Sequence, residues 1–298
     1  ALLSNTTGAK NTATGANSLD ANTTGSENTA FGQQSLTANT TASMNTAVGY
    51  FSLALNTTGA ENVAMGHSAL DANTTGNGNN AFGFESLTSN TTASNNTAFG
   101  HKTLFANTTG AFNTAVGANA LDTNTTASYN VAFGYISLED NTTGTNNTAV
   151  GSLSLANNTT ASQNTALGYA SMSVNTTGGS NTAVGHKSLR QNTTANENTA
   201  MGHDAGENIT TGDENVAIGN LTLDACTTGT DNTAVGARAL GALTTGIQNT
   251  ACGYKAGHVV TTGVQNTFVG ENSGIVCTGD RNTVVGRDSG GLLTSGDN

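Results

Sequence analysis

Residues 45–61 read Asn-Thr-Ala-Val-Gly-Tyr-Phe-Ser-Leu-Ala-Leu-Asn-Thr-Thr-Gly-Ala-Glu, and units of this kind recur about seventeen times along the 298-residue chain. The Gly of Asn-Thr-Ala-x-Gly returns every 17 residues from Gly15 to Gly270, and then after 16 residues at Gly286. A fixed short period is typical of architectures in which each repeat packs only against its neighbours. The repeat therefore decides the fold.

The length of the unit excludes paired helices, because helical repeats run to about 33–47 residues. Thr, Val and Phe favour strands, and Asn and Gly favour turns. Each unit therefore predicts two short strands, Asn-Thr-Ala-x and Asn-Thr-Thr, separated by two turns. The sequence predicts an all-β fold, a narrow β-roll or β-solenoid of about 17 coils of 17 residues, forming a single repetitive rod over residues 1–298.

Exchanges between units predict which positions face inward. The residue before the repeated Gly is a large apolar one, such as Val48 or Met65, and is expected to be buried. Two residues before this apolar position, Val63 replaces the usual Thr. Alternate residues of a strand lie on the same face, so this position is also predicted to face inward. Leu19, Leu36 and their successors form a second apolar column, which Gly takes over in some later units.

The Asn of Asn-Thr-Thr gives way to apolar residues in the last units, so it is predicted to face inward as a ladder of stacked amides that satisfy one another. The predicted inner Asn column consists of Asn22, Asn39, Asn56, Asn73, Asn90, Asn107, Asn124, Asn141, Asn158, Asn175 and Asn192. Its aliphatic continuation is Ile209, Cys226, Leu243, Val260 and Leu293. We therefore expect Asn-ladder coils over 1–208 and coils with an aliphatic interior over 209–298. Burial would leave most of the formal N-glycosylation sequons inert.

The Thr after each inner Asn, in a file from Thr6 to Thr261, is predicted to face outward. Regular Thr files resemble the ice-binding faces of some β-solenoid antifreeze proteins. Those faces pair two outward files, whereas the neighbouring position here is Gly25 or Ala42. The simpler interpretation of the Thr file is a ladder that supports a sheet or an interface. Ice binding through this file is the alternative function.

The residue after the repeated Gly forms an aromatic stripe, which is a candidate interface or ligand surface. It consists of Tyr50, His67, Phe84, His101, Tyr135, Tyr169, His186, His203 and Tyr254. Three interpretations stay open: a subunit interface, a strip that offers aromatic rings to a sugar or protein, and stacking between adjacent coils.

Metal, catalytic and cofactor sites are not predicted. His186 and His203 lie one coil apart with Asp204 beside them, but zinc needs more ligands, so a surface His ladder is expected. Cys226, Cys252 and Cys277 stand at positions otherwise held by Asn, apolar residues or Thr, with no disulfide framework. No catalytic triad, phosphate-binding loop or metalloprotease motif occurs, so the chain is not expected to be an enzyme.

Composition excludes further classes of function. Only 8 residues are basic and the net charge is −11, which argues against nucleic-acid binding. No apolar run approaches the roughly 20 residues that span a bilayer, so membrane insertion is not expected. The chain begins and ends in mid-unit, which leads us to expect a fragment of a longer protein.

The motifs Asn-Thr-Ala-Val-Gly (45–49 and 181–185) and Thr-Gly-Val-Gln-Asn-Thr-Phe-Val-Gly (262–270) resemble the repetitive β-solenoid shafts of phage tail fibres and bacterial surface fibres. They are also similar to the head β-rolls of trimeric autotransporter adhesins, which have a shorter repeat. The resemblance implies an extracellular fibre or adhesin shaft on a cell surface or virion, giving reach and attachment without catalysis. It also implies a parallel homotrimer or filament, with a cell-surface glycan or protein as a possible receptor. The aromatic stripe or the Gly25–Ala42 file would then be buried between chains.

Overall fold

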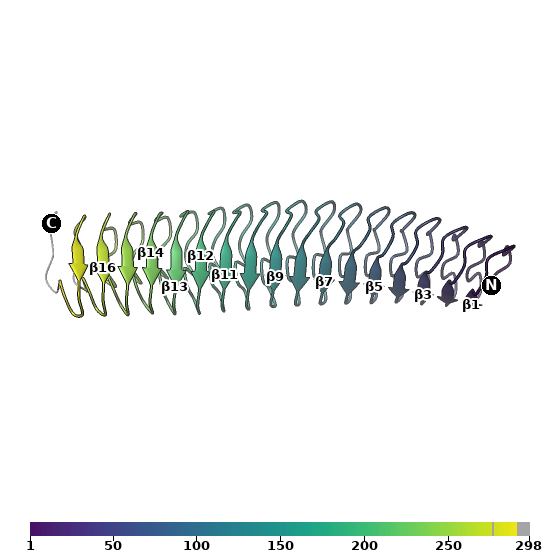
Figure 1. Ribbon diagram of the computed structural model, residues 1–298, viewed down its shortest axis with the longest axis horizontal. Helices are drawn as coiled ribbons and strands as arrows, with labels where there is room; N and C mark the ends of the chain where they lie inside the picture. The colour runs from purple at the N-terminus through teal and green to yellow at the C-terminus, as the bar shows by residue number, and fades with distance from the viewer. Residues whose placement is uncertain (276, 291–298) are drawn as a thin grey trace. The chain divides into compact units, whose positions relative to one another are not determined.

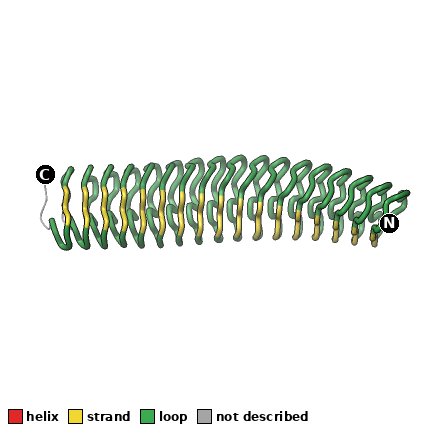
Figure 2. The backbone as a smooth tube through the Cα atoms, in the orientation of Figure 1, coloured by secondary structure: helices red, strands yellow, loops and turns green. Residues whose placement is uncertain are grey.

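The computed structural model describes residues 1–275 and 277–290, and no helix is present in them. The chain divides into two compact units, residues 1–146 and residues 147–298. In each unit, every coil contributes one short strand that pairs in parallel with the strand of the next coil (Figures 1 and 2). The predicted all-β solenoid is confirmed.

Each strand has three residues and covers the Thr-Ala-apolar part of a unit. The first unit contains β1 (Thr12–Thr14), β2 (Thr29–Phe31), β3 (Thr46–Val48), β4 (Val63–Met65), β5 (Asn80–Phe82), β6 (Thr97–Phe99), β7 (Thr114–Val116) and β8 (Val131–Phe133). The second unit contains β9 (Thr148–Val150), β10 (Thr165–Leu167), β11 (Thr182–Val184), β12 (Thr199–Met201), β13 (Val216–Ile218), β14 (Thr233–Val235), β15 (Thr250–Cys252), β16 (Thr267–Val269) and β17 (Thr283–Val285).

The expectation of two strands per coil is wrong, because the Asn-Thr-Thr segment is not a strand in any described coil. Its backbone nevertheless bonds from coil to coil: the Thr57 amide donates to the Thr74 carbonyl at 2.9 Å. The same Thr74 carbonyl also accepts from the Thr58 amide at 3.1 Å. One carbonyl therefore serves two amides, a bent arrangement that differs from a regular ladder.

The predicted direction of the strand residues is also wrong. Ala47, in the middle of β3, is fully buried, whereas the apolar residue before the Gly faces outward and is 40% exposed at Met65. Val131, in the Thr position, is 38% exposed. Strand residues alternate between faces, and where the Leu column is present the narrow coil has room for only a methyl group on the inner side. The large residues are therefore on the outside.

The interior is filled mainly by the Leu column, which is buried as predicted from Leu19 onward. These residues have left-handed backbone, with φ of 51° at Leu53, a conformation that Gly257 and Gly274 adopt without strain where they replace Leu. Phe268 stands between those two glycines in place of the usual Ala, and it is fully buried. A Cβ on either glycine would meet the Phe268 ring. The aromatic ring thus fills the volume that two missing Leu side chains leave.

Candidate functional surfaces

The inner Asn column lies in the core of the coils. All eleven residues from Asn22 to Asn192 are fully buried. Asn73 is typical: its Nδ2 donates to the Asn56 Oδ1 at 2.8 Å and to the Gly76 carbonyl at 3.0 Å, and its Oδ1 accepts from the Asn90 Nδ2 at 3.0 Å. The buried amides therefore satisfy one another along the axis of the coils. These eleven sequon asparagines are therefore not presented to a glycosyltransferase by the folded chain, whereas Asn5, which also begins an Asn-Thr-Thr triplet, is exposed.

The column becomes apolar after Asn192, whose Oδ1 is buried without a hydrogen-bond partner. Ile209, Cys226, Leu243 and Val260 are all fully buried at this position, whereas Leu293 lies outside the described residues. Cys277 also occupies this column and not a Thr position. Its amide donates to the Gly274 carbonyl, in the same way as the Val260 amide donates to the Gly257 carbonyl. The missing residue of the short unit is therefore one of the two Thr. Burial raises the pKa of the Cys226 thiol to about 11.

A second buried Asn column, which the sequence analysis missed, lies at the start of each strand. The Asn45 amide donates to the Asn28 Oδ1 at 3.0 Å, and the Asn45 Nδ2 donates to the Gly59 carbonyl at 2.9 Å. The same pattern continues to Asn282 at the last strand. The signal was present in the sequence, since every one of the seventeen units has Asn at this position.

The aromatic stripe is exposed, and many of its rings stack on one another. In the first unit, ring centroids are 5.2 Å apart for Tyr50 and His67, 5.2 Å for His67 and Phe84, and 5.4 Å for Phe84 and His101. In the second unit, Tyr169, His186 and His203 follow one another at 5.4 Å and 4.8 Å. Tyr135 and Tyr254 are also exposed. Stacked rings cover one another's faces, so this geometry suits contacts between adjacent coils better than capture of a sugar ring.

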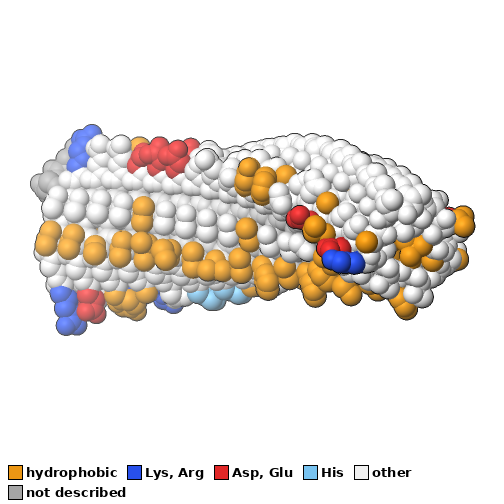
Figure 3. All heavy atoms as spheres, turned by 45° about the vertical axis from the view of Figure 1, so that its right-hand side comes forward, with side chains coloured by type: hydrophobic (Ala, Val, Ile, Leu, Met, Phe, Trp, Pro, Cys, Tyr) orange, Lys and Arg blue, Asp and Glu red, His pale blue; other side chains and the backbone are white. Residues whose placement is uncertain are grey.

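The apolar residues at the ends of the strands form a second exposed surface, which we call the apolar strand file. In the first unit it includes Phe31, Met65, Phe99 and Phe133, and in the second unit Leu167, Met201, Ile218, Val235, Val269 and Val285. Figure 3 shows such side chains in a row that follows the coils, with an acidic group at a different edge of the molecule. The file also contains an aromatic contact, with the Phe82 and Phe99 rings 5.6 Å apart.

The Thr file behaves differently from the prediction. Thr57 is half-buried, and its hydroxyl donates to the Thr74 carbonyl of the next coil at 2.9 Å. Thr108 bonds to Thr125 in the same way at 3.0 Å. These hydroxyls stabilise the stack, because each donates its hydrogen bond to a backbone carbonyl of the next coil. The Thr that follows, such as Thr58, is the exposed one, and Gly25 and Ala42 face inward and are buried, so they cannot form an interface between chains.

Half-buried carboxyls follow the Leu column at Asp71, Asp122 and Asp224, and burial raises the pKa of each above the ordinary value of 3.8. A raised pKa in the folded state means that folding takes up protons. The free energy of unfolding therefore falls as pH rises from about 4 through the raised pKa. Asp122 is the clearest case, since its Oδ1 is buried without a hydrogen-bond partner.

Replacement of Asp122 by Asn should raise the Tm at neutral pH, because the buried negative charge disappears. The gain should shrink as the pH falls toward about 4, because the raised pKa lets folded Asp122 take up a proton there. Thermal denaturation across this pH range measures both effects. Asp231→Asn, at an exposed turn, is the control for charge alone. A lower Tm for Asp122→Asn at neutral pH would contradict the expectation.

No protein-family model matches the chain, and a search of curated proteins finds no relative. The described residues contain no helix that could cross a membrane. No pocket is found on the described part of the surface. The exposed files along the coils are thus the surfaces from which a function can be argued.

Proposed function

We propose that the chain is a structural fibre segment, extracellular and without catalytic activity, in which copies of the chain pack together through the apolar strand file. The single observation that carries this proposal is the row of large apolar side chains left exposed on the strands, with Phe99 at 57% and Leu167 at 45%. Contiguous exposed apolar surface of this kind normally marks an interface.

A second copy of the chain is the partner that fits this file best. The apolar side chains repeat from coil to coil at the inter-strand spacing of about 4.8 Å. A partner with the same axial period can match them residue by residue along a whole unit, and another copy has that period. Uncharged Thr residues such as Thr233 flank the file within the strands, so the strands themselves bring no charged group into the contact when two files meet. A parallel homotrimer is the assembly that the resemblance to fibre shafts favours.

Charge introduced into the file should disrupt this assembly. We expect the double variant Ile218→Lys/Val235→Lys to raise the dissociation constant by more than about 100-fold, because each Lys would have to be desolvated in the interface. The control is Thr211→Lys/Thr228→Lys, which adds the same charge at exposed Thr positions of the same region. Sedimentation equilibrium measures the assembly, and circular dichroism checks that both variants fold. A wild-type monomer at tens of micromolar, or equal association of both variants, would exclude the proposal.

Ice binding is a second candidate, because the strands do present two outward files. In β14 these are Thr233 and Val235, and in the second unit the apolar file contains no aromatic residue that would break a flat face. Inhibition of ice recrystallisation, measured on the same two double variants, separates the candidates. Activity in the wild type that only the strand variant abolishes would favour ice binding, whereas inactive wild type leaves self-association as the use of the face.

A further inference from the structure

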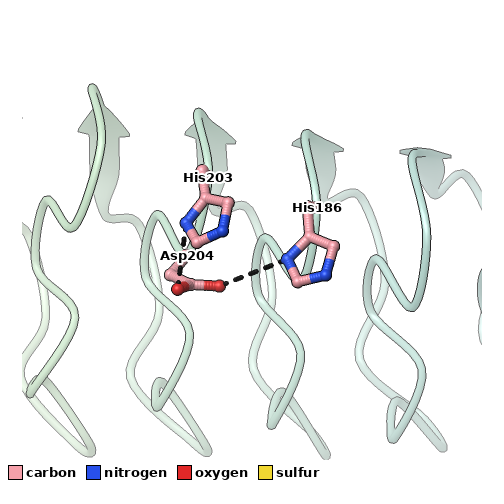
Figure 4. A group of neighbouring side chains, drawn as sticks. All are labelled: His186, His203 and Asp204. Atoms are coloured by element: carbon pink, nitrogen blue, oxygen red, sulfur yellow. Dashed lines mark ion pairs between the residues drawn. The ribbon is translucent and has the colours of Figure 1, made fainter.

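Two stacked imidazoles and a carboxylate meet at one point of the second unit. His186 and His203 come from successive coils, with ring centroids 4.8 Å apart and planes inclined by 10°. The Asp204 carboxylate lies beside the stacked rings, next to the Nδ1 atom of each (Figure 4). One of its oxygens is 3.6 Å from the His186 Nδ1 and the other is 3.0 Å from the His203 Nδ1. The three side chains offer ligand atoms that all lie within 4.8 Å of one another.

The backbone holds the carboxylate in this place. Asp204 has a left-handed conformation with φ of 53°, and its amide donates to the His186 carbonyl at 3.0 Å. The side chain is only 15% exposed, although both His side chains are much more exposed. The Oδ1 that faces His186 is buried and has no hydrogen-bond partner. A buried carboxylate oxygen without a donor is costly, and a bound cation would satisfy it.

We propose that His186, His203 and Asp204 bind a divalent transition-metal ion of the zinc class. Two imidazole nitrogens and one carboxylate oxygen are ligands that zinc accepts, and the fourth tetrahedral position is left for water. Ligand atoms around tetrahedral zinc are about 3.4 Å apart, given bonds of about 2.1 Å. The two carboxylate oxygens lie near this distance, at 3.6 Å from the His186 Nδ1 and 3.0 Å from the His203 Nδ1, and rotation of the exposed rings would bring the nitrogens toward one ion.

Metal binding at this site would break only weak contacts of the His side chains. The Asn220 Nδ2 lies 3.5 Å from the His203 Nδ1, and metal binding would displace this marginal interaction. From the same three residues, the sequence predicted a surface His ladder. What the sequence did not show is that the left-handed turn places the Asp204 carboxylate against the Nδ1 atoms of both rings, with one oxygen lacking a hydrogen-bond partner.

The first unit contains natural controls for this arrangement. His67 and His101 occupy the equivalent position of their coils, but both stack on Phe84 and not on another His. Among the residues that the structure describes, only the group at His186 combines three possible ligands. The controls share the exposure and ring stacking of the proposed site but lack its donor set.

Titration with Co²⁺, followed by visible absorption and by competition with Zn²⁺, tests the proposal on the intact chain. We expect one ion per chain and a spectrum of low-symmetry four-coordinate cobalt. Asp204→Asn, which keeps the shape of the side chain, and His203→Gln should each weaken binding by more than about 10-fold. His67→Gln and His101→Gln should leave it unchanged.

Two results would overturn the site: no saturable binding by the wild type, or binding that Asp204→Asn and His203→Gln leave intact. Circular dichroism shows whether each variant folds, and Zn²⁺ should raise the Tm of the wild type but not that of folded Asp204→Asn. Since the site lies outside the apolar strand file, its failure would not affect the proposed self-association.

Discussion

Replacement of Gly236 by Ala should unfold several coils of the second unit, with a loss of at least about 3 kcal/mol in the free energy of unfolding. Gly236 has φ of 125°, a conformation that residues with a Cβ rarely adopt. A Cβ there would also lie 2.5 Å from the Gly253 carbonyl oxygen of the next coil. Both effects act together, because the strained backbone cannot move away without breaking the parallel stack. Urea denaturation followed by circular dichroism measures the loss.

Gly229→Ala is the matched control for this prediction. A Cβ on Gly229 would lie at the same 2.5 Å from a carbonyl oxygen of the next coil, that of Gly246, but the backbone there is not in the left-handed region. The sequence also tolerates Ala in this column, at Ala42, Ala93, Ala127, Ala161 and Ala195. The control should therefore cost much less than Gly236→Ala. Equal costs would show that contact distance, and not backbone conformation, governs these positions.

Replacement of Asn175 by Ala should cost about 3–4 kcal/mol, because it breaks the inner Asn column in mid-ladder. The Asn175 Nδ2 donates to the Asn158 Oδ1 at 2.8 Å, and its Oδ1 accepts from the Asn192 Nδ2 at 3.0 Å. The variant loses both bonds and leaves a buried acceptor without its donor. Chemical denaturation of the purified chain gives the cost.

Asn192→Ala removes the same atoms at the end of the ladder and should cost only about 1–2 kcal/mol. Its own Oδ1 has no partner, so the variant exchanges one unsatisfied acceptor for another, the Asn175 Oδ1. The double variant should cost less than the sum of the two single variants, since the bond between the two residues is counted in both. Additive costs, or equal costs for the two single variants, would contradict a cooperative amide ladder.

Much of the fold followed from the sequence, because the 17-residue spacing of one Gly imposes both the coil and its register. The inner Asn column was also readable, since Asn192 is followed by Ile209 at the same position, and only burial makes such an exchange plausible. Both inferences rest on physical properties that change sharply between water and a core. They did not require knowledge of the coil's width.

The strand direction could not be obtained from the same kind of exchange. Val48, Met65 and Phe99 replace one another as core residues do, yet they lie outside because, beside the Leu column, the interior accepts only the methyl group of residues such as Ala47. The overlooked signal was that Ala holds the middle strand position in every unit from Ala13 to Ala251. Likewise every unit has Asn at the position of Asn45, and without exchanges between polar and apolar residues the burial of this position could not be inferred. Side-chain clusters such as that at Asp204 depend on left-handed turns, which the sequence pattern did not reveal.

The amide ladders give each unit an electrical direction. In both Asn columns the side-chain oxygen of one coil accepts a hydrogen bond from the following coil: the Asn56 Oδ1 accepts from the Asn73 Nδ2, and the Asn28 Oδ1 accepts from the Asn45 backbone amide. The amide dipoles therefore add along the axis, as peptide dipoles do in a helix. The last amide of such a column presents an acceptor, so the stack favours a donor-bearing coil at that end. Two such stacks that join end to end would therefore meet in one orientation, with the acceptor end of one against the donor end of the other.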